Sequence, residues 1–171
     1  TFSITIIDAN EFGPTAPVDT NPTTNVVNEN VAIGTMVGVT ANSVDNDATN
    51  NAVTYSLLDS DGGSFAIDAN TGVVTTAAAL DRETLGASRN ITVRATSADG
   101  STADTIFTIS INDIDEFNVG AVTDSNAVAN TVAENAAIGI VVGITGSATD
   151  FDATNSQITY TLDDNAGGRF A

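Results

Sequence analysis

The 171-residue sequence contains no cysteine, no histidine, no tryptophan and no lysine. These absences exclude disulfides, thiol and imidazole metal ligands, and catalysis by cysteine or histidine. Apolar runs are only a few residues long, so we expect no transmembrane helix. The opening residues, TFSITIID, have neither the basic nor the apolar region of a secretion signal, and we expect any such signal outside this segment.

Positive charge is nearly absent as well. The chain has 22 acidic residues and 4 basic ones, all arginine, which gives a net charge of −18 at pH 7. Phosphate groups are bound by cationic side chains, so we expect no nucleic-acid partner and no insertion into or docking to an anionic membrane. Hydrophobic residues make up 42% of the chain, which is enough to build a core. An excess of Asp and Asn without His or Cys favours hard cations held by oxygen atoms, such as Ca²⁺.

A direct repeat organises the chain. ITIIDANEF at 4–12 recurs as ISINDIDEF at 109–117, and VDNDATNNAVTYSL at 44–57 recurs as TDFDATNSQITYTL at 149–162. Every pair is offset by 105 residues, and about half of the aligned positions are identical. The pattern indicates a tandem array, in which each repeat has the usual size of a domain. It predicts three parts: the last strand and linker of a preceding repeat at 1–15, a complete repeat with its C-terminal linker at 16–117, and the first half of the next repeat at 118–171.

Within the complete repeat, apolar and polar residues alternate with the period of a β-strand. Val37 and Val39 alternate with polar or small residues, and so do Ile91 and Val93. Similar patterns, with a first strand near 24–28, predict seven short strands separated by Gly, Asn and Asp turns, and long amphipathic helices are missing. We therefore predict an all-β fold, a seven-stranded antiparallel Greek-key sandwich repeated every 105 residues.

The acidic residues gather in four places of the repeat, at strand ends and in loops. These are Glu29, the DND sequence at 45–47, the LDRE sequence at 80–83, and the segment 8–11 that recurs at 113–116. Alternate residues of an extended loop point the same way, so D-x-D directs two carboxylates to one place. Such carboxylates repel one another, and Ca²⁺, which takes six to eight oxygen ligands, removes the repulsion.

These motifs, in this order, resemble cadherin repeats. The matching pieces are the V-x-E-N start, the D-x-D followed by V-x-Y-S-L, F-x-I-D-x-x-T-G-x-V, L-D-R-E and the D-x-N-E-F linker, and they cover nearly the whole unit. The lean composition without Cys and Lys looks like the cadherin-like repeats of large bacterial surface or secreted adhesins. The resemblance implies Ca²⁺ ions at the junctions between successive domains.

The resemblance also implies the ligands. For the second junction, with two or three Ca²⁺ ions, they are Glu29, Asp81, Glu83, Asp113, Asp115, Glu116, Asp150 and Asp152, with Asn155 as a neutral ligand or orienter. For the first junction they are Asp8, Asn10, Glu11, Asp45, Asp47 and Asn50. Two departures stand out. Phe12 and Phe117 offer only backbone carbonyls to an ion, and Ser97 occupies the aspartate position of the family's A-x-D motif, with Asp99 two residues further on.

Other interpretations of the same residues are plainer. Asp and Asn are ordinary turn residues, and a single D-x-D is more often a turn than a metal site. Paired carboxylates can hydrolyse glycosides, but that needs one carboxyl in an apolar pocket, so we expect no enzyme. We expect a Ca²⁺-rigidified extracellular stalk or fibre, at the cell surface or secreted. Its partners would be neighbouring repeats, and further identical chains or extracellular polysaccharide. The alternative is a carbohydrate-binding or homophilic cell-adhesion module.

Overall fold

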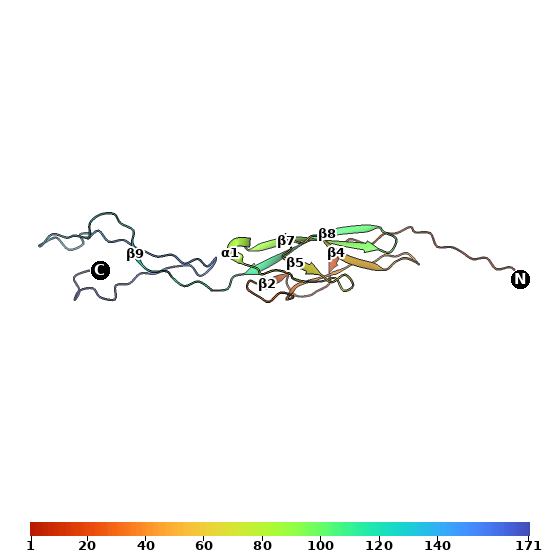
Figure 1. Cartoon of the computed structure of the whole chain (residues 1–171), viewed down its shortest axis with the longest axis horizontal. Coiled ribbons are helices and arrows are strands. Elements are labelled where there is room, and N and C mark those ends of the chain that lie inside the picture. Colours follow the sequence, from red (N-terminus) through yellow and green to blue (C-terminus); the bar gives the residue numbers. More distant parts are fainter. The chain divides into compact units, whose positions relative to one another are not determined.

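The computed structural model describes residues 1–171, which divide into a first unit, Thr1–Ile114, and a second unit, Asp115–Ala171. The first unit holds most of the regular structure (Figure 1). Its elements are β1 (Val18–Asp19), β2 (Val26–Asn28), β3 (Met36–Asn42), β4 (Val53–Asp59), β5 (Phe65–Ile67), β6 (Val73–Thr76), the one-turn helix α1 (Arg82–Leu85), β7 (Ser88–Ser97) and β8 (Thr102–Asn112).

These strands form two four-stranded sheets that enclose one core. One sheet has the order β1-β3-β6-β5 and the other the order β2-β8-β7-β4. Alternate side chains of β3, β7 and β8 point inward, and the fully buried ones include Val37, Val39, Ile91, Val93 and Ile109. The predicted all-β sandwich is therefore confirmed, and the alternation that predicted its strands marks the side chains that fill its core.

Two details differ from the sequence prediction. The first strand expected near 24–28 is β2, but an additional two-residue strand, β1, precedes it and belongs to the other sheet, so the unit has eight strands. Between them the Asp19 carboxylate accepts hydrogen bonds from the backbone of Asn21 (2.9 Å) and Thr40 (3.0 Å), which turns the chain, and Pro22 has no N–H for a ladder. β2 then pairs with β8 in parallel, while the other strand pairs are antiparallel.

The predicted turn at DANTG, residues 68–72, lies between β5 and β6. The Asp68 carboxylate accepts the backbone N–H groups of Asn70 (3.0 Å) and Thr71 (2.8 Å). Gly72 follows with φ +71°, and a Cβ atom there would lie 2.1 Å from the carbonyl oxygen of Ala41. Only glycine fits both the conformation and the space, so Gly72 allows the start of β6 to lie directly against β3.

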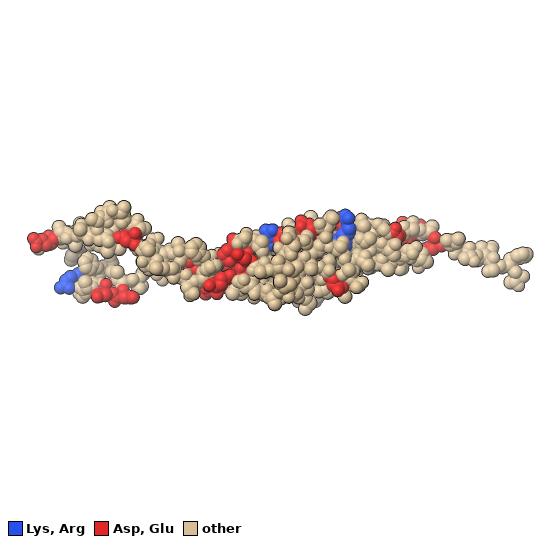
Figure 2. Space-filling view, in the orientation of Figure 1, with Lys and Arg blue, Asp and Glu red and all other residues tan.

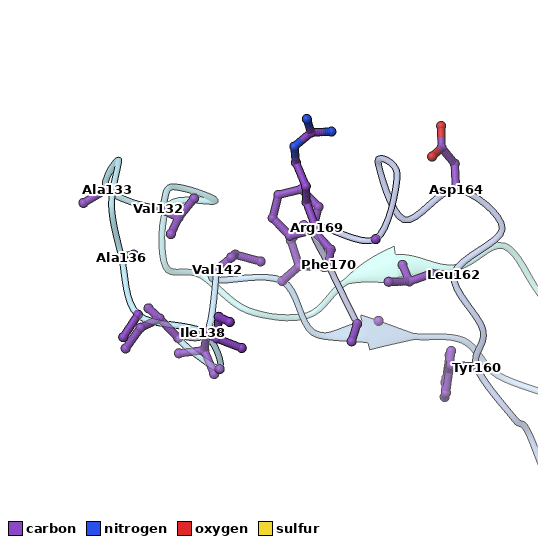
Figure 3. A pocket seen from close by; sticks show the side chains of 18 of the residues that line it. Val132, Ala133, Ala136, Ile138, Val142, Tyr160, Leu162, Asp164, Arg169 and Phe170 are labelled. Atoms are coloured by element: carbon purple, nitrogen blue, oxygen red, sulfur yellow. The ribbon is translucent and has the colours of Figure 1, made fainter.

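The second unit contains the short pair β9 (Thr123–Asp124) and β10 (Gly146–Ser147). Beside it lies a hollow lined by apolar side chains (Figure 3), among them Val132, Val142, Tyr160 and Phe170. Their counterparts 105 residues earlier are Val27, Val37, Tyr55 and Phe65, all buried in the first unit's core. The hollow thus corresponds to the part of the core that β7 and β8 cover in the first unit.

α1, with four residues, is far too short to span a membrane, and no helix in the structure has the length and hydrophobicity to do so.

Candidate metal centres

Two groups of three carboxylates lie in the first unit. We call them the Glu29 group (Glu29, Asp81, Glu83) and the Asp45 group (Asp45, Asp47, Asp99), and in each the ligand oxygens lie within 4.8 Å of one another. The first group adjoins the start of β7 and the second its end. A ten-residue strand spans about 30 Å, so the groups occupy opposite ends of the sandwich. Acidic side chains are visible at both ends in Figure 2.

The Glu29 group is built around a buried side chain. Glu29 follows β2 and is only 1% exposed. One of its carboxylate oxygens accepts the backbone N–H of Arg82 (2.5 Å) and the other that of Ile114 (2.8 Å). Glu29 therefore ties β2 both to α1 and to the segment that leaves β8, with its negative charge held inside the fold.

Asp81 precedes α1 and Glu83 lies within it, and the sequence prediction did not include this helix. Asp81 is the N-cap, and its carboxylate accepts hydrogen bonds from the backbone N–H (3.0 Å) and hydroxyl (2.8 Å) of Thr84. These hydrogen bonds lower the pKa of Asp81, so it is a carboxylate at neutral pH. The helical turn places both acidic residues of L-D-R-E beside Glu29.

The Asp45 group lies at the other end of the sandwich. Asp45 and Asp47, 6% and 4% exposed, precede β4. Asp45 accepts hydrogen bonds from the backbone N–H of Asp47 (3.1 Å) and from the hydroxyl of Ser97. Asp47 accepts the backbone N–H groups of Glu11 (3.1 Å) and Phe12 (3.2 Å). The D-x-D motif thus holds the linker that enters the first unit.

The same linker contact recurs in the second unit. Asp152 is 5% exposed and accepts the backbone N–H groups of Glu116 (3.0 Å) and Phe117 (3.2 Å). The backbone N–H of Asp152 points to the Asp150 carboxylate at 3.5 Å. Each of these residues lies 105 positions after its counterpart in the first unit. Both repeats therefore fix a linker on the second aspartate of D-x-D.

The remaining predicted residues lie in linkers and turns. Asp8 accepts the backbone N–H (3.0 Å) and hydroxyl (2.7 Å) of Thr49. Asn50 and Asn155 adopt left-handed turns with φ of 53° and 59°. In the segment after β8, Asp113 is half-buried, whereas Asp115 and Glu116 are exposed. The grouping of residues 113–116 with 150–155 stays a prediction.

Asp99 was not among the predicted ligands. It lies in the turn between β7 and β8, and hydrogen bonds from the hydroxyl and backbone of Ser101 lower its pKa. Its other oxygen accepts the side-chain N–H of Asn10 (2.5 Å). The Asp99-Gly100 pair could have pointed to this position, because Asp-Gly is typical of a tight turn. A tight turn directly after β7 keeps Asp99 close to the end of that strand.

No cationic side chain is directed at the Asp45 group. Arg89 pairs with Asp61 and Arg94 with Asp104, and the remaining two arginines donate to backbone carbonyls, Arg82 to that of Ile111 and Arg169 to that of Ala166. Asp45 and Asp47 are thus buried carboxylates without an arginine as hydrogen-bond partner. A set of oxygen-only, negatively charged donors is what Ca²⁺ requires, so the residues fit this ion.

A family model described as cadherin domain matches residues 23–112. The chain belongs to the cadherin family. Protocadherin Fat 1 of Homo sapiens is 32% identical over 174 residues, which cover 98% of this chain and 4% of that protein. Cadherin-7 of Gallus gallus is 49% identical over 72 residues, which cover 41% of this chain and 9% of that protein. This cadherin chain therefore spans less than a tenth of the length of either relative.

Solved structures agree on the cadherin fold. Extracellular cadherin domains 1–4 of protocadherin gamma B7 match with a TM-score of 0.71 and 22% identity, over 93% of this chain and 38% of that chain. Domains EC22–24 of mouse cadherin-23 match with a TM-score of 0.61 and 26% identity, over 85% and 46%. Protocadherin gammaB7 EC3–6 matches with a TM-score of 0.65 and 22% identity, over 86% and 37%, and its structure is a cis-dimer.

The comparisons confirm the cadherin resemblance at the level of the family, and these relatives are animal proteins. Cadherin domains are extracellular, non-enzymatic adhesion modules that typically bind Ca²⁺, pack in tandem and form homophilic dimers. The prediction that the chain is no enzyme agrees with this family.

Proposed function

We propose that the chain is a Ca²⁺-rigidified part of an extracellular adhesin or fibre, which acts as a stalk or spacer in adhesion or matrix assembly. The observation that carries the proposal is the linker contact found in both repeats, in which Asp47 and Asp152 hold the backbone of the preceding linker beside acidic side chains. The composition without Cys and Lys supports the type of repeat that large bacterial surface or secreted adhesins contain.

The linker after β8 donates backbone hydrogen bonds to one carboxylate that precedes it in the sequence and to another that follows it. Within the first unit, Glu29 accepts the N–H of Ile114, and within the second unit Asp152 accepts the N–H of Glu116. We therefore assign residues 113–117 to a junction between a complete repeat, 16–117, and the next one, which starts at 118. Its proposed ligands are those that the sequence predicts: Glu29, Asp81, Glu83, Asp113, Asp115, Glu116, Asp150, Asp152 and Asn155.

The preceding linker is assigned in the same way. Residues 1–15 would contain the last strand and linker of an earlier repeat, and Asp8, Asn10, Glu11, Asp45, Asp47 and Asn50 would serve that junction. Ca²⁺, when bound, supplies a charge that neutralises the carboxylates and a coordination sphere of six to eight oxygens. Without a cation, the carboxylates of linker and repeat repel one another, which favours a linker that bends.

Calorimetric titration of the full 171-residue chain with Ca²⁺ tests this proposal. We expect saturable binding that Mg²⁺ reproduces poorly, because crowded carboxylates suit the larger and more flexible coordination sphere. Asp115→Ala and Asp152→Ala should each weaken binding at the 113–117 junction. The matched control is Asp163→Ala, in the loop before Gly167, which should leave the titration unchanged.

Small-angle X-ray scattering of the same chain tests whether Ca²⁺ stiffens the linker, as a stalk requires. A chelator should shorten the maximum dimension, because a released linker samples bent conformations, and physiological salt alone should not restore it, because screening does not bridge ligands. A wild-type chain that binds no Ca²⁺, or that binds it without any change in scattering, would refute the stalk.

A further inference from the structure

The turn between β7 and β8 places an acidic side chain, Asp99, at the end of the sandwich where β7 stops, although β7 itself ends in an uncharged residue. Ser97, the last residue of β7, is 3% exposed and carries no charge. Its hydroxyl is directed at the Asp45 carboxylate and lies 3.0 Å from the backbone carbonyl oxygen of Asn50. Asp99 follows two residues later, and the turn brings its carboxylate within 4.8 Å of those of Asp45 and Asp47.

We propose that Asp99 is a Ca²⁺ ligand of the Asp45 group. This inference rests on the proposed function, because it names a further ligand of the same kind of site. In this chain, the third carboxylate at this end of the repeat comes from the β7–β8 turn and not from the end of β7.

The contacts of Asp99 suit this role. One of its oxygens accepts the backbone N–H (2.7 Å) and hydroxyl (2.6 Å) of Ser101, which fixes the side chain against its own turn. The other accepts the side-chain N–H of Asn10 from the linker (2.5 Å). Asp99 thus connects the turn, the linker and the D-x-D motif, and its oxygens retain further lone pairs.

Charge supports the same assignment. Asp45 and Asp47 are buried, Asp99 adds a third negative charge beside them, and the hydrogen bonds of all four arginines go to other partners. Gathering a third carboxylate here raises repulsion unless a cation is bound, and each added carboxylate strengthens the binding of a hard divalent cation.

Luminescence of bound terbium can distinguish the Asp45 group from the Glu29 group. The Tyr55 hydroxyl accepts the backbone N–H of Ser43 (2.9 Å), two residues before Asp45, and Tyr55 pairs with Ala95 near the end of β7. Ser88, at the far end of β7, is about 23 Å from Ala95 along the strand. In the full chain carrying Tyr160→Phe, Tyr55 is the only tyrosine, so terbium luminescence excited through tyrosine reports on the Asp45 group.

We expect Asp99→Asn to raise the terbium concentration at half-saturation, and the Ca²⁺ concentration that displaces terbium, by tenfold or more. Asp104→Asn, which removes one charge from the same hairpin, should change both by less than twofold. Circular dichroism melts in chelator check the fold, and Asp99→Ser, another turn-compatible neutral residue, replaces Asp99→Asn if that variant does not fold.

The outcomes separate the two claims. A Tyr160→Phe chain that binds neither terbium nor Ca²⁺ overturns the proposed function itself. Binding that Asp99→Asn and Asp99→Ser leave unchanged overturns only the role of Asp99. Loss of luminescence in the Asp99 variants but not in Asp104→Asn supports the assignment.

Discussion

Replacing Glu29 by glutamine tests whether one buried carboxylate serves both the fold and the proposed Ca²⁺ site. In the wild type, each carboxylate oxygen accepts one backbone N–H, from Arg82 and from Ile114. A glutamine oxygen can accept one of these, but its NH₂ group then faces the other N–H, which loses its partner. An unsatisfied buried donor costs about 1–3 kcal/mol, so Glu29→Gln should destabilise the first unit by that amount in chelator.

Ca²⁺ adds a second, separable loss. A ligand present at a hundredfold excess over its Kd stabilises the folded state by about 2.7 kcal/mol. If Glu29→Gln weakens binding tenfold, about 1.4 kcal/mol of this is lost. One kcal/mol corresponds to about 4–8 °C in Tm for a domain near this size, so the Ca²⁺-induced rise in Tm should shrink by about 6–11 °C.

Thermal melts followed by circular dichroism measure both losses, with and without Ca²⁺, since the chain has no tryptophan for fluorescence. Glu134→Gln is the matched control, because Glu134 occupies the same position in the next repeat, is exposed, and removes the same charge. The reasoning is wrong if Glu29→Gln gains as much Tm from Ca²⁺ as the wild type, or if Glu134→Gln lowers the melting of the first unit equally.

Three further predictions concern single groups. Tyr55→Phe should lower the free energy of unfolding by about 1–3 kcal/mol, because the Tyr55 hydroxyl accepts a buried backbone N–H. Tyr160 makes the equivalent hydrogen bond but is half-exposed, so Tyr160→Phe should cost much less in the same denaturant titration. Gly72→Ala should prevent normal folding or lower Tm strongly, as judged by circular dichroism, because its Cβ would meet a carbonyl oxygen, while Gly62→Ala faces open space and should be far milder. Hydrogen bonds lower the pKa of Asp68, so its carboxylate stabilises the folded state above its ordinary pKa, and that contribution disappears as the pH falls through the lowered value. The acid-induced fall in Tm below about pH 4 should therefore be shallower in Asp68→Asn, and equal slopes would contradict this.

The strands of the core were predictable because a single rule places their side chains. Residues with period-two alternation, such as Val37, Val39, Ile91 and Val93, all proved buried, since every second side chain of a strand faces the same core. The same rule explains why Asp45 and Asp47 share one direction. The 105-residue repeat also accounts for the second linker contact, because Asp152, Glu116 and Phe117 occupy the positions of Asp47, Glu11 and Phe12.

Other features depend on contacts that no local pattern encodes. Glu29 is buried because backbone N–H groups more than 50 residues away reach it, and its 1% exposure has no signature in VVNENVAIG. Asp99 joins the Asp45 group through the fold of a turn, where strand periodicity no longer applies. The additional strand β1 and its place in the other sheet likewise depend on which neighbours that segment meets, and so does the parallel direction of β2.

That parallel direction has a mechanical consequence. β2 lies near the start of the complete repeat and β8 at its end, and they are joined by the pairs Val26–Ser110, Val27–Ile111 and Asn28–Asn112. When the two ends of the repeat are pulled apart, parallel strands are drawn past each other along their length, so these hydrogen bonds are strained together and not opened one after another. A tandem protein under tension would thus resist through the short edge strand β2, and the Glu29 carboxylate, which joins the end of β2 to Ile114, adds a further connection between the same two segments.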